Sequence, residues 1–148
     1  MGAYFDEFTE GELIEHALSK TVMESDNNLF SLLTMNHHPV HLDITHAEST
    51  QHGQVLVVGT YVLSLVVGFT VGDVSGKAIA NLGYDDVRHL APVFVGDTLR
   101  ARTMVLSKRP SSTKQDRGVL EVETTGINQH GKEVLKFKRK VLLKKRPR

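Results

Sequence analysis

Hydrophobic and polar positions change their spacing along the chain at about residue 72. Before that point, residues 12–22 have the pattern of a strand, and the stretch "SDNNLFSLL" places Leu29, Phe30 and Leu33 on one face of a helix. Ser25 is a suitable N-cap for this helix, and Asp26 lies in its first turn, where a carboxylate suits the helix dipole.

Two signals then limit helical structure around a group of histidines. Pro39 should stop any helix from running through this group, because proline lacks the backbone N–H that a helix interior requires. Asp43 can cap a short helical turn that ends at Ala47.

The stretch "QVLVVGTYVLSLVVGFTV", residues 54–71, contains no charged residue. Its valines favour a strand, but no turn interrupts it and it is long for one strand. It is also somewhat short for a membrane span. We therefore expect a central helix that is buried on every side, with its Gly and Ser residues allowing close approach of a sheet.

After residue 72 the pattern alternates with the period of β-strands. Strands are expected within residues 77–90, 97–109, 118–129 and 133–143, separated by turn-rich stretches, with the last two forming a hairpin. Helices followed by antiparallel strands, with one apolar helix as the core, predict an α+β fold. The length of 148 residues suits a single domain over residues 1–148.

The composition excludes several kinds of site. The chain has no cysteine, which excludes disulfides, thiolate metal ligands and a cysteine nucleophile. No basic-then-apolar leader opens the sequence, so we expect a cytoplasmic protein without a membrane association.

The net charge of +1 conceals an asymmetry. Residues 1–135 contain all 17 acidic groups, whereas residues 136–148, "KFKRKVLLKKRPR", contain eight basic groups and no acid. Such a segment could meet nucleic acid, a membrane surface or a phosphate-bearing ligand. Because Lys136, Lys138 and Lys140 alternate with the intervening residues, we favour a last strand with one solvated face, and nucleic-acid binding ranks last among the functions considered.

The stretch "TMNHHPVHLD" places three of the eight histidines within five residues. Together with Asp43 and His46 they supply enough ligand atoms for a metal. However, Pro39 removes the helical spacing that makes paired histidines a specific zinc motif, and adjacent His37 and His38 point to different sides of an extended chain. We therefore expect no metal site.

The same stretch resembles the hydratase motif of the MaoC-like, (R)-specific enoyl-CoA hydratases, which reads Asp, any residue, Asn, Pro, an aliphatic residue, His. Two further segments resemble this family. They are "QHGQVLVVG", in which a glycine N–H faces the thioester oxygen, and "APVFVGDTLRARTMVLSKR". The segments "ESDN", "LTMN" and "NLGYDDVR" resemble the branch that acts on mesaconyl- or itaconyl-CoA.

The resemblance implies a hotdog fold, in which a curled antiparallel sheet wraps a long central helix. It implies a homodimer with sites at the subunit junction, an acyl-CoA substrate and no separate cofactor. The implied reaction is addition of water across the C2–C3 double bond of an enoyl-CoA thioester, or the reverse elimination. His41 and Gly59 occupy the positions of the catalytic histidine and of the glycine that contacts the thioester.

One departure from the motif affects the chemistry. The catalytic Asp of the family is Asn36 here, and its Asn is His38. An amide can orient a water molecule but cannot take its proton at neutral pH. We therefore expect His41 to act as base and then acid on a water held by Asn36. Asp26 is a candidate substitute carboxylate, with a plain first-turn role as the equal alternative.

A dicarboxylic substrate needs a further cation, because its second carboxylate must be neutralised. Arg88, His37 or His38 could supply one, although Arg88 could equally pair with Asp85 or Asp86. Two rival functions stay open at this point. A hotdog thioesterase would normally place an acid on the central helix, which has none, and a non-catalytic CoA-binding module would explain Asn36 directly.

Overall fold

The computed structural model describes residues 1–148 and is built around one five-stranded antiparallel sheet. The order across the sheet is β1-β3-β4-β5-β2, so β1 and β2 form its edges. Each predicted strand is present, and its ends differ from the prediction by at most two residues. The strands are β1 (Leu13–Thr21), β2 (Ala78–His89), β3 (Thr98–Pro110), β4 (Arg117–Ile127) and β5 (Glu133–Lys144).

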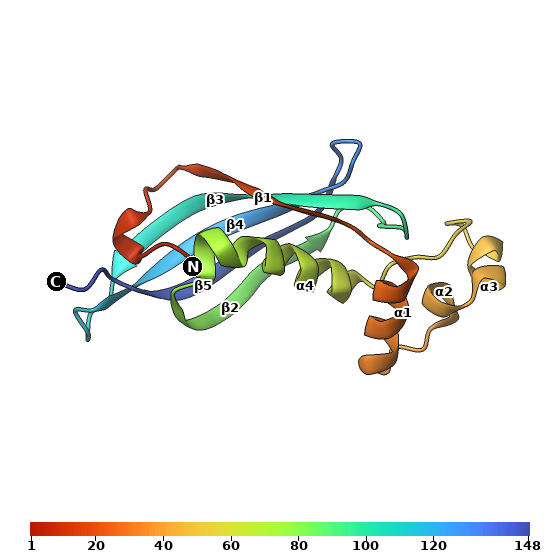
Figure 1. The fold of residues 1–148 in the computed structure, drawn as a ribbon, viewed down its shortest axis with the longest axis horizontal. Coiled ribbons are helices and arrows are strands. Elements are labelled where there is room, and N and C mark those ends of the chain that lie inside the picture. Colours follow the sequence, from red (N-terminus) through yellow and green to blue (C-terminus); the bar gives the residue numbers. More distant parts are fainter.

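The helix α4 (Gly59–Thr70) lies along one face of the sheet, whose long strands curve around it (Figure 1). A turn of π-helix, η2 (Val71–Ser75), continues it toward β2. The approach to β4 is close, since a Cβ atom at Gly126 would stand 2.9 Å from Cγ2 of Val66. A glycine of the strand, rather than one of the helix, therefore provides the room for packing.

The central helix is shorter and less enclosed than the sequence predicts. Residues 54–58 are not helical, because Val57 donates a hydrogen bond to the carbonyl of Val93 and Leu56 forms a bridge with Phe94. Ser64 and Gly68 of α4 are exposed, although Val66 on the opposite face is fully buried. The expectation of burial on every side is thus wrong for this chain by itself, because the sheet covers one face only.

Three short helices lie beyond one end of the sheet, next to the start of α4 (Figure 1). They are α1 (Glu24–Leu33), α2 (Pro39–Leu42) and α3 (Ile44–Ser49). Asp43 caps α3 as expected, accepting a hydrogen bond from the His46 N–H. Pro39 occupies the first position of α2, where its missing N–H costs nothing. Pro39 therefore starts a helix that contains His41. The sequence analysis expected it only to prevent a helix from running through the histidines.

The burial of α1 is the reverse of the sequence prediction. The buried side chains are the polar Asn27 and Ser31, both with no exposed surface, whereas Leu29 and Leu33 are 58% and 73% exposed. Of the predicted apolar face, only the half-buried Phe30 meets the rest of the chain, with its ring 5.5 Å from that of Tyr61, while the two leucines point away from it. The N-cap is Met23 rather than Ser25, because the backbone turns into the helix at Met23, whose N–H donates to the Asp26 carboxylate.

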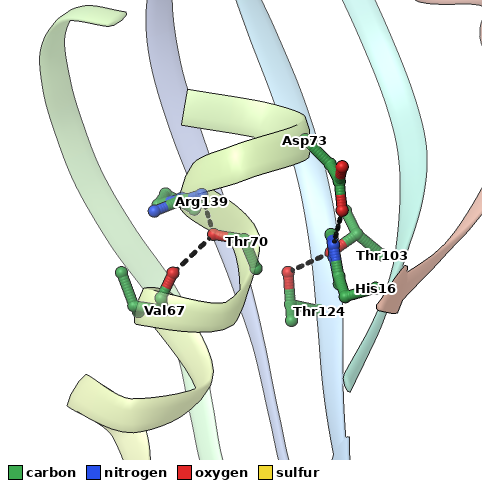
Figure 2. A network of polar contacts seen from close by, with 7 residues as sticks. All are labelled: His16, Val67, Thr70, Asp73, Thr103, Thr124 and Arg139. Atoms are coloured by element: carbon green, nitrogen blue, oxygen red, sulfur yellow. Dashed lines mark hydrogen bonds and ion pairs between the residues drawn. The ribbon is translucent and has the colours of Figure 1, made fainter. Parts of the chain in front are cut away.

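A chain of polar contacts fastens the far end of α4 to the sheet (Figure 2). The His16 ring lies between the Asp73 carboxylate, 2.8 Å from Nδ1, and the Thr103 hydroxyl, 2.7 Å from Nε2. Thr103 in turn contacts the Thr124 hydroxyl at 2.9 Å. These groups join η2 to β1, β3 and β4, so the end of α4 is held by directional bonds as well as by apolar packing.

The basic run near the C-terminus is divided between two environments. Lys138 and Lys140 of β5 pair in register with Glu123 and Glu121 of β4, which agrees with a charged, solvated face. Arg139 is only 2% exposed and donates a hydrogen bond to the Thr70 hydroxyl at 2.9 Å (Figure 2).

None of the helices is both long enough and apolar enough to span a membrane.

Candidate functional site

His41 is held by α2 with its ring oriented toward the segment that precedes α4. Its Nδ1 lies 2.7 Å from the carbonyl oxygen of Leu56. A carbonyl can only accept, so Nδ1 carries the hydrogen, and in the neutral ring the lone pair is on Nε2. His41 thus has a fixed tautomer and one free basic nitrogen, which is the arrangement that a general base requires.

Gly59 is the first residue of α4. Its N–H therefore has no acceptor within the helix, and the helix dipole favours negative charge in front of it. No side chain caps this end of the helix. The position predicted for a thioester-binding amide is thus a helix start, where a developing oxyanion is stabilised.

A pocket of about 340 Å³ opens at this helix start. Its walls are mostly apolar, and its polar side chains are the imidazoles of His52 and His89. Leu56, whose carbonyl accepts the hydrogen bond from His41, also lines the wall, whereas His41 itself does not. The pocket therefore includes Gly59, whereas His41 is connected to its wall only through the hydrogen bond to the Leu56 carbonyl.

His89 is a candidate functional residue that the sequence analysis missed. A register shift in β2 between Asp85 and Arg88, with Asp86 at a φ of 56°, bends the edge strand before His89. The ring of His89 then lies against Gly59, since a Cβ atom there would stand 3.0 Å from its Cε1. Only the bend in the strand creates this contact, so the sequence gives no local signal for it.

Asn27 is the second residue that the sequence analysis missed. Its buried amide contacts the carbonyls of His41 and Leu56 and the N–H of Val58. It therefore touches both segments that carry the predicted site residues. Asn27 is the last residue of the family-like segment "ESDN", but the sequence analysis assigned a role only to its neighbour Asp26.

The other residues of the histidine stretch lie near His41 and are mostly exposed. The N-cap of α2 is His38, whose Nδ1 accepts from the Val40 N–H at 3.1 Å and whose ring centre is 6.1 Å from that of His41. The side chain of Asn36 accepts a long bond, 3.4 Å, from the His38 N–H. His37 is exposed and has no hydrogen bond. Roles in holding water or substrate stay predictions for all three residues.

Asp26 and Arg88 each have partners that do not belong to the pocket. Asp26 accepts from the Met23 N–H and pairs with Lys20 at 2.9 Å, and both contacts lower the pKa of its carboxyl. Arg88 pairs with Asp86 at 3.1 Å, and its side chain is 66% exposed. No hydrogen bond joins Asp26 to His41, so its role as a substitute carboxylate stays a prediction, as does substrate binding by Arg88.

The Tyr61 hydroxyl of α4 responds to its burial and to the charge of Asp26. Burial raises the pKa of the Tyr61 hydroxyl, and the negative charge of Asp26 raises it further.

The structure contains no group of three or more His, Asp or Glu side chains arranged to hold a metal ion.

Comparison with known proteins agrees with the suspected family. A family model described as mesaconyl-CoA hydratase matches residues 1–148. The mesaconyl-CoA hydratase of Cereibacter sphaeroides is 37% identical over 145 residues, which are 98% of this chain and 42% of that protein. The (R)-specific enoyl-CoA hydratase of Rhodospirillum rubrum is 31% identical over 111 residues, 72% of each chain.

Solved structures with the same fold include larger proteins. A putative MaoC domain dehydratase from Chloroflexus aurantiacus is 34% identical with a TM-score of 0.93, and the match covers 99% of this chain and 41% of that one. A conserved hypothetical protein from Mycobacterium tuberculosis with a double hotdog fold has a TM-score of 0.89 at 24% identity, over 99% and 45% of the chains. The α+β arrangement described above is therefore the hotdog fold.

The chain spans about 42% of the length of the mesaconyl-CoA hydratase that it matches. The match nevertheless extends over the whole of this sequence and includes the histidine stretch, the start of α4 and all five strands. The chain belongs to the mesaconyl-CoA hydratase family.

Proposed function

We propose that this chain supplies the catalytic unit of a hydratase/dehydratase, a carbon–oxygen lyase, for enoyl-CoA thioesters. The observation that carries the proposal is the hydrogen bond from His41 Nδ1 to the Leu56 carbonyl, because it leaves Nε2 as a free base on a ring that is held against the segment leading into α4. The family model and the names of the relatives support the same chemistry.

In the hydration direction, Nε2 of His41 takes a proton from a water molecule oriented by Asn36, and the water oxygen bonds to C3 of the thioester. The C2–C3 π electrons move toward the thioester carbonyl, and the Gly59 N–H stabilises the resulting enolate oxygen. The imidazolium then returns its proton to C2. Water is consumed whole, so the reaction needs no redox partner and no cofactor.

The substrate class we propose is an acyl-CoA with a second carboxylate, such as mesaconyl-CoA. The family description supports it, and so does a pocket whose polar side chains are both imidazoles, which attract an anion when they are protonated. Arg88, His37 and His38 are exposed cations or potential cations outside this pocket that could contact the same group.

We further propose that the unit works as a homodimer, or beside a second hotdog unit of a longer chain, in the cytoplasm. The edge strand β2 has a neighbour on one side only and exposes four large apolar side chains, Ile79, Leu82, Tyr84 and Val87. An exposed apolar edge of this kind normally pairs with another strand. The apolar face of α1 is a second surface that a partner would cover.

The function is tested by following the enoyl absorbance of crotonyl-CoA and mesaconyl-CoA as water is added. Loss of absorbance with formation of the 3-hydroxyacyl-CoA supports the proposal. Release of free CoA thiol would support a thioesterase instead, and tight binding of both thioesters without turnover would support a non-catalytic CoA-binding module.

The dimer is tested by light scattering, with Leu82→Glu expected to produce a monomer.

A further inference from the structure

The buried side chain of Asn27 connects the two halves of the proposed site. Asn27 belongs to the second turn of α1 and has no exposed surface. Its Nδ2 donates to the carbonyl oxygens of His41 and Leu56, both at 3.2 Å. Its Oδ1 accepts from the N–H of Val58 at 2.9 Å. One amide thus contacts the α2 segment and the segment that leads into α4.

The orientation of this amide is determined by its surroundings. Two carbonyl oxygens face one end and a backbone N–H faces the other, so exchanging the oxygen and nitrogen of Asn27 would leave all three contacts repulsive. Both Nδ2 hydrogens and the oxygen are used. Neither aspartate nor leucine, which have a similar shape, can reproduce this set of one acceptor and two donors.

The contacts of Asn27 reach the backbone of His41 itself and the two residues Leu56 and Val58 of the segment that leads into Gly59. Leu56 O receives Asn27 Nδ2–H and also His41 Nδ1–H, so the same carbonyl that fixes the tautomer of His41 is itself held by Asn27. Val58, whose N–H is bound by Oδ1, immediately precedes Gly59. A backbone bond from Leu56 N to Val40 O joins the same two segments.

We infer that Asn27 is a positioning residue, which sets the distance and orientation of His41 relative to the Gly59 N–H. This inference rests on the proposed hydratase function. It also accounts for the unusual burial of α1, whose polar side chains point inward while its leucines remain exposed. The role of α1 is then to deliver this amide to the site.

The inference is tested with Asn27→Asp and Asn27→Ala, with Ser31→Ala as the matched control. Ser31 lies one turn further along α1, is equally buried, and its hydroxyl has no hydrogen-bond partner. Because a displacement of about 1 Å can cost roughly 100-fold in rate, kcat of the Asn27 variants should fall by about that factor. KM should change far less, and Ser31→Ala should retain the wild-type values.

A spectroscopic measurement separates this inference from the proposed function. In the wild-type protein, ¹⁵N NMR should report the Nδ1–H tautomer of His41 and slow exchange of the Asn27 side-chain hydrogens. The Asn27 variants should shift His41 toward a tautomer mixture. If the wild-type protein hydrates neither thioester, the proposed hydratase function is wrong. The NMR measurement would still test whether Asn27 fixes the tautomer of His41.

Two results would overturn the inference. One is a folded Asn27 variant whose kcat stays within about twofold of wild type. The other is an NMR result on the wild-type protein, which can be obtained even if both variants fail to fold. Either His41 in the Nε2–H form or Asn27 side-chain hydrogens that exchange as fast as exposed ones would contradict the inference.

Discussion

Gly59 and His89 are in contact across the mouth of the pocket, with the imidazole lying over the Cα atom that starts α4. A methyl group at Gly59 would stand 3.0 Å from Cε1 and 3.2 Å from Nε2 of that ring. The backbone of Gly59 does not need a glycine, because its φ lies outside the left-handed region. What the position requires is space in front of the amide.

Gly59→Ala is therefore expected to fold normally and to lose activity. The added methyl group either displaces His89 or occupies the space that the thioester oxygen needs, so kcat/KM should fall by roughly tenfold or more. Thermal unfolding and hydration of crotonyl-CoA measure the two effects. The double variant Gly59→Ala/His89→Ala should recover part of the loss if the clash with His89 is its cause. Unchanged activity in Gly59→Ala would remove this amide from the mechanism.

His41→Ala should abolish hydration while the protein remains folded. The ring is partly exposed, so little packing is lost, but the basic nitrogen whose tautomer is fixed by the Leu56 carbonyl is removed. General acid–base catalysis is worth about 10²–10⁴-fold, and kcat should fall within that range. His37→Ala is the control when crotonyl-CoA is the substrate, because His37 is exposed and crotonyl-CoA has no second carboxylate for it to contact. Activity within a few-fold of wild type in His41→Ala would contradict the mechanism.

Arg88→Ala distinguishes a role in substrate binding from a surface ion pair. Arg88 is exposed and paired with Asp86, so its removal should leave the free energy of unfolding nearly unchanged. If it also meets the second carboxylate of the substrate, KM should rise about tenfold for mesaconyl-CoA but not for crotonyl-CoA. If the variant and wild type have equal KM values with both thioesters, Arg88 does not bind substrate and serves only in the ion pair with Asp86.

Asp26 should make the stability of the protein sensitive to acid. Hydrogen bonds from Lys20 and the Met23 N–H lower the pKa of its carboxyl in the folded state. A lowered folded pKa contributes stability at pH values above the unfolded pKa, and this contribution is lost as the pH falls through the folded value. Between about pH 5 and pH 2.5, urea midpoints should therefore fall more steeply for wild type than for Asp26→Asn.

The same variant also tests the catalytic role considered for Asp26. A carboxylate that only caps α1 can be replaced by an amide without loss of hydration at pH 7. A loss of 100-fold or more in kcat, beyond what the unfolding midpoint explains, would identify a second acid–base group.

His16→Leu should weaken the attachment of the far end of α4. The His16 side chain has no exposed surface and contacts both Asp73 and Thr103 (Figure 2). Its removal leaves the Thr103 hydroxyl with Thr124 only, so the free energy of unfolding should fall by about 1–3 kcal/mol. Hydration activity should persist, because these contacts lie at the opposite end of α4 from Gly59. A variant as stable as wild type would show that the network is energetically neutral.

The order of elements could be predicted from the sequence because each depends on a local pattern. The alternation between Thr98 and Lys108 predicts a strand, and β3 confirms it. On the side that holds the odd-numbered residues, Leu99, Ala101, Thr103 and Val105 are buried, whereas Ser107 is exposed. The core helix followed from a different local signal, because the uncharged run that contains Val62 and Val66 is long for a strand and has no turn within it. The histidine motif at His41 was also recognisable, because the motif is continuous in the sequence.

The inversion of α1 was not predictable in this way. The leucines at positions 29 and 33 follow the helical period, but the helix turns Asn27 inward because three backbone groups from two other segments converge there. In this chain, the hydrogen bonds that Asn27 makes to distant segments stabilise the observed orientation of α1 more than burial of the two leucines would. The N-cap at Met23 has a similar origin, because the direction of the chain after β1 fixes where the helix begins.

By itself the sequence determined the period of each element, the absence of charge in the core helix and the presence of an imidazole after Pro39. Those properties are local, since they depend on residues a few positions apart. The tertiary structure alone decided that Nδ1 of His41 meets the Leu56 carbonyl, that His89 covers Gly59 and that Asn27 joins both segments. Each of these contacts joins residues that are far apart in the sequence, so it depends on how the short helices, the segment before α4 and the end of β2 pack together and not on any one segment.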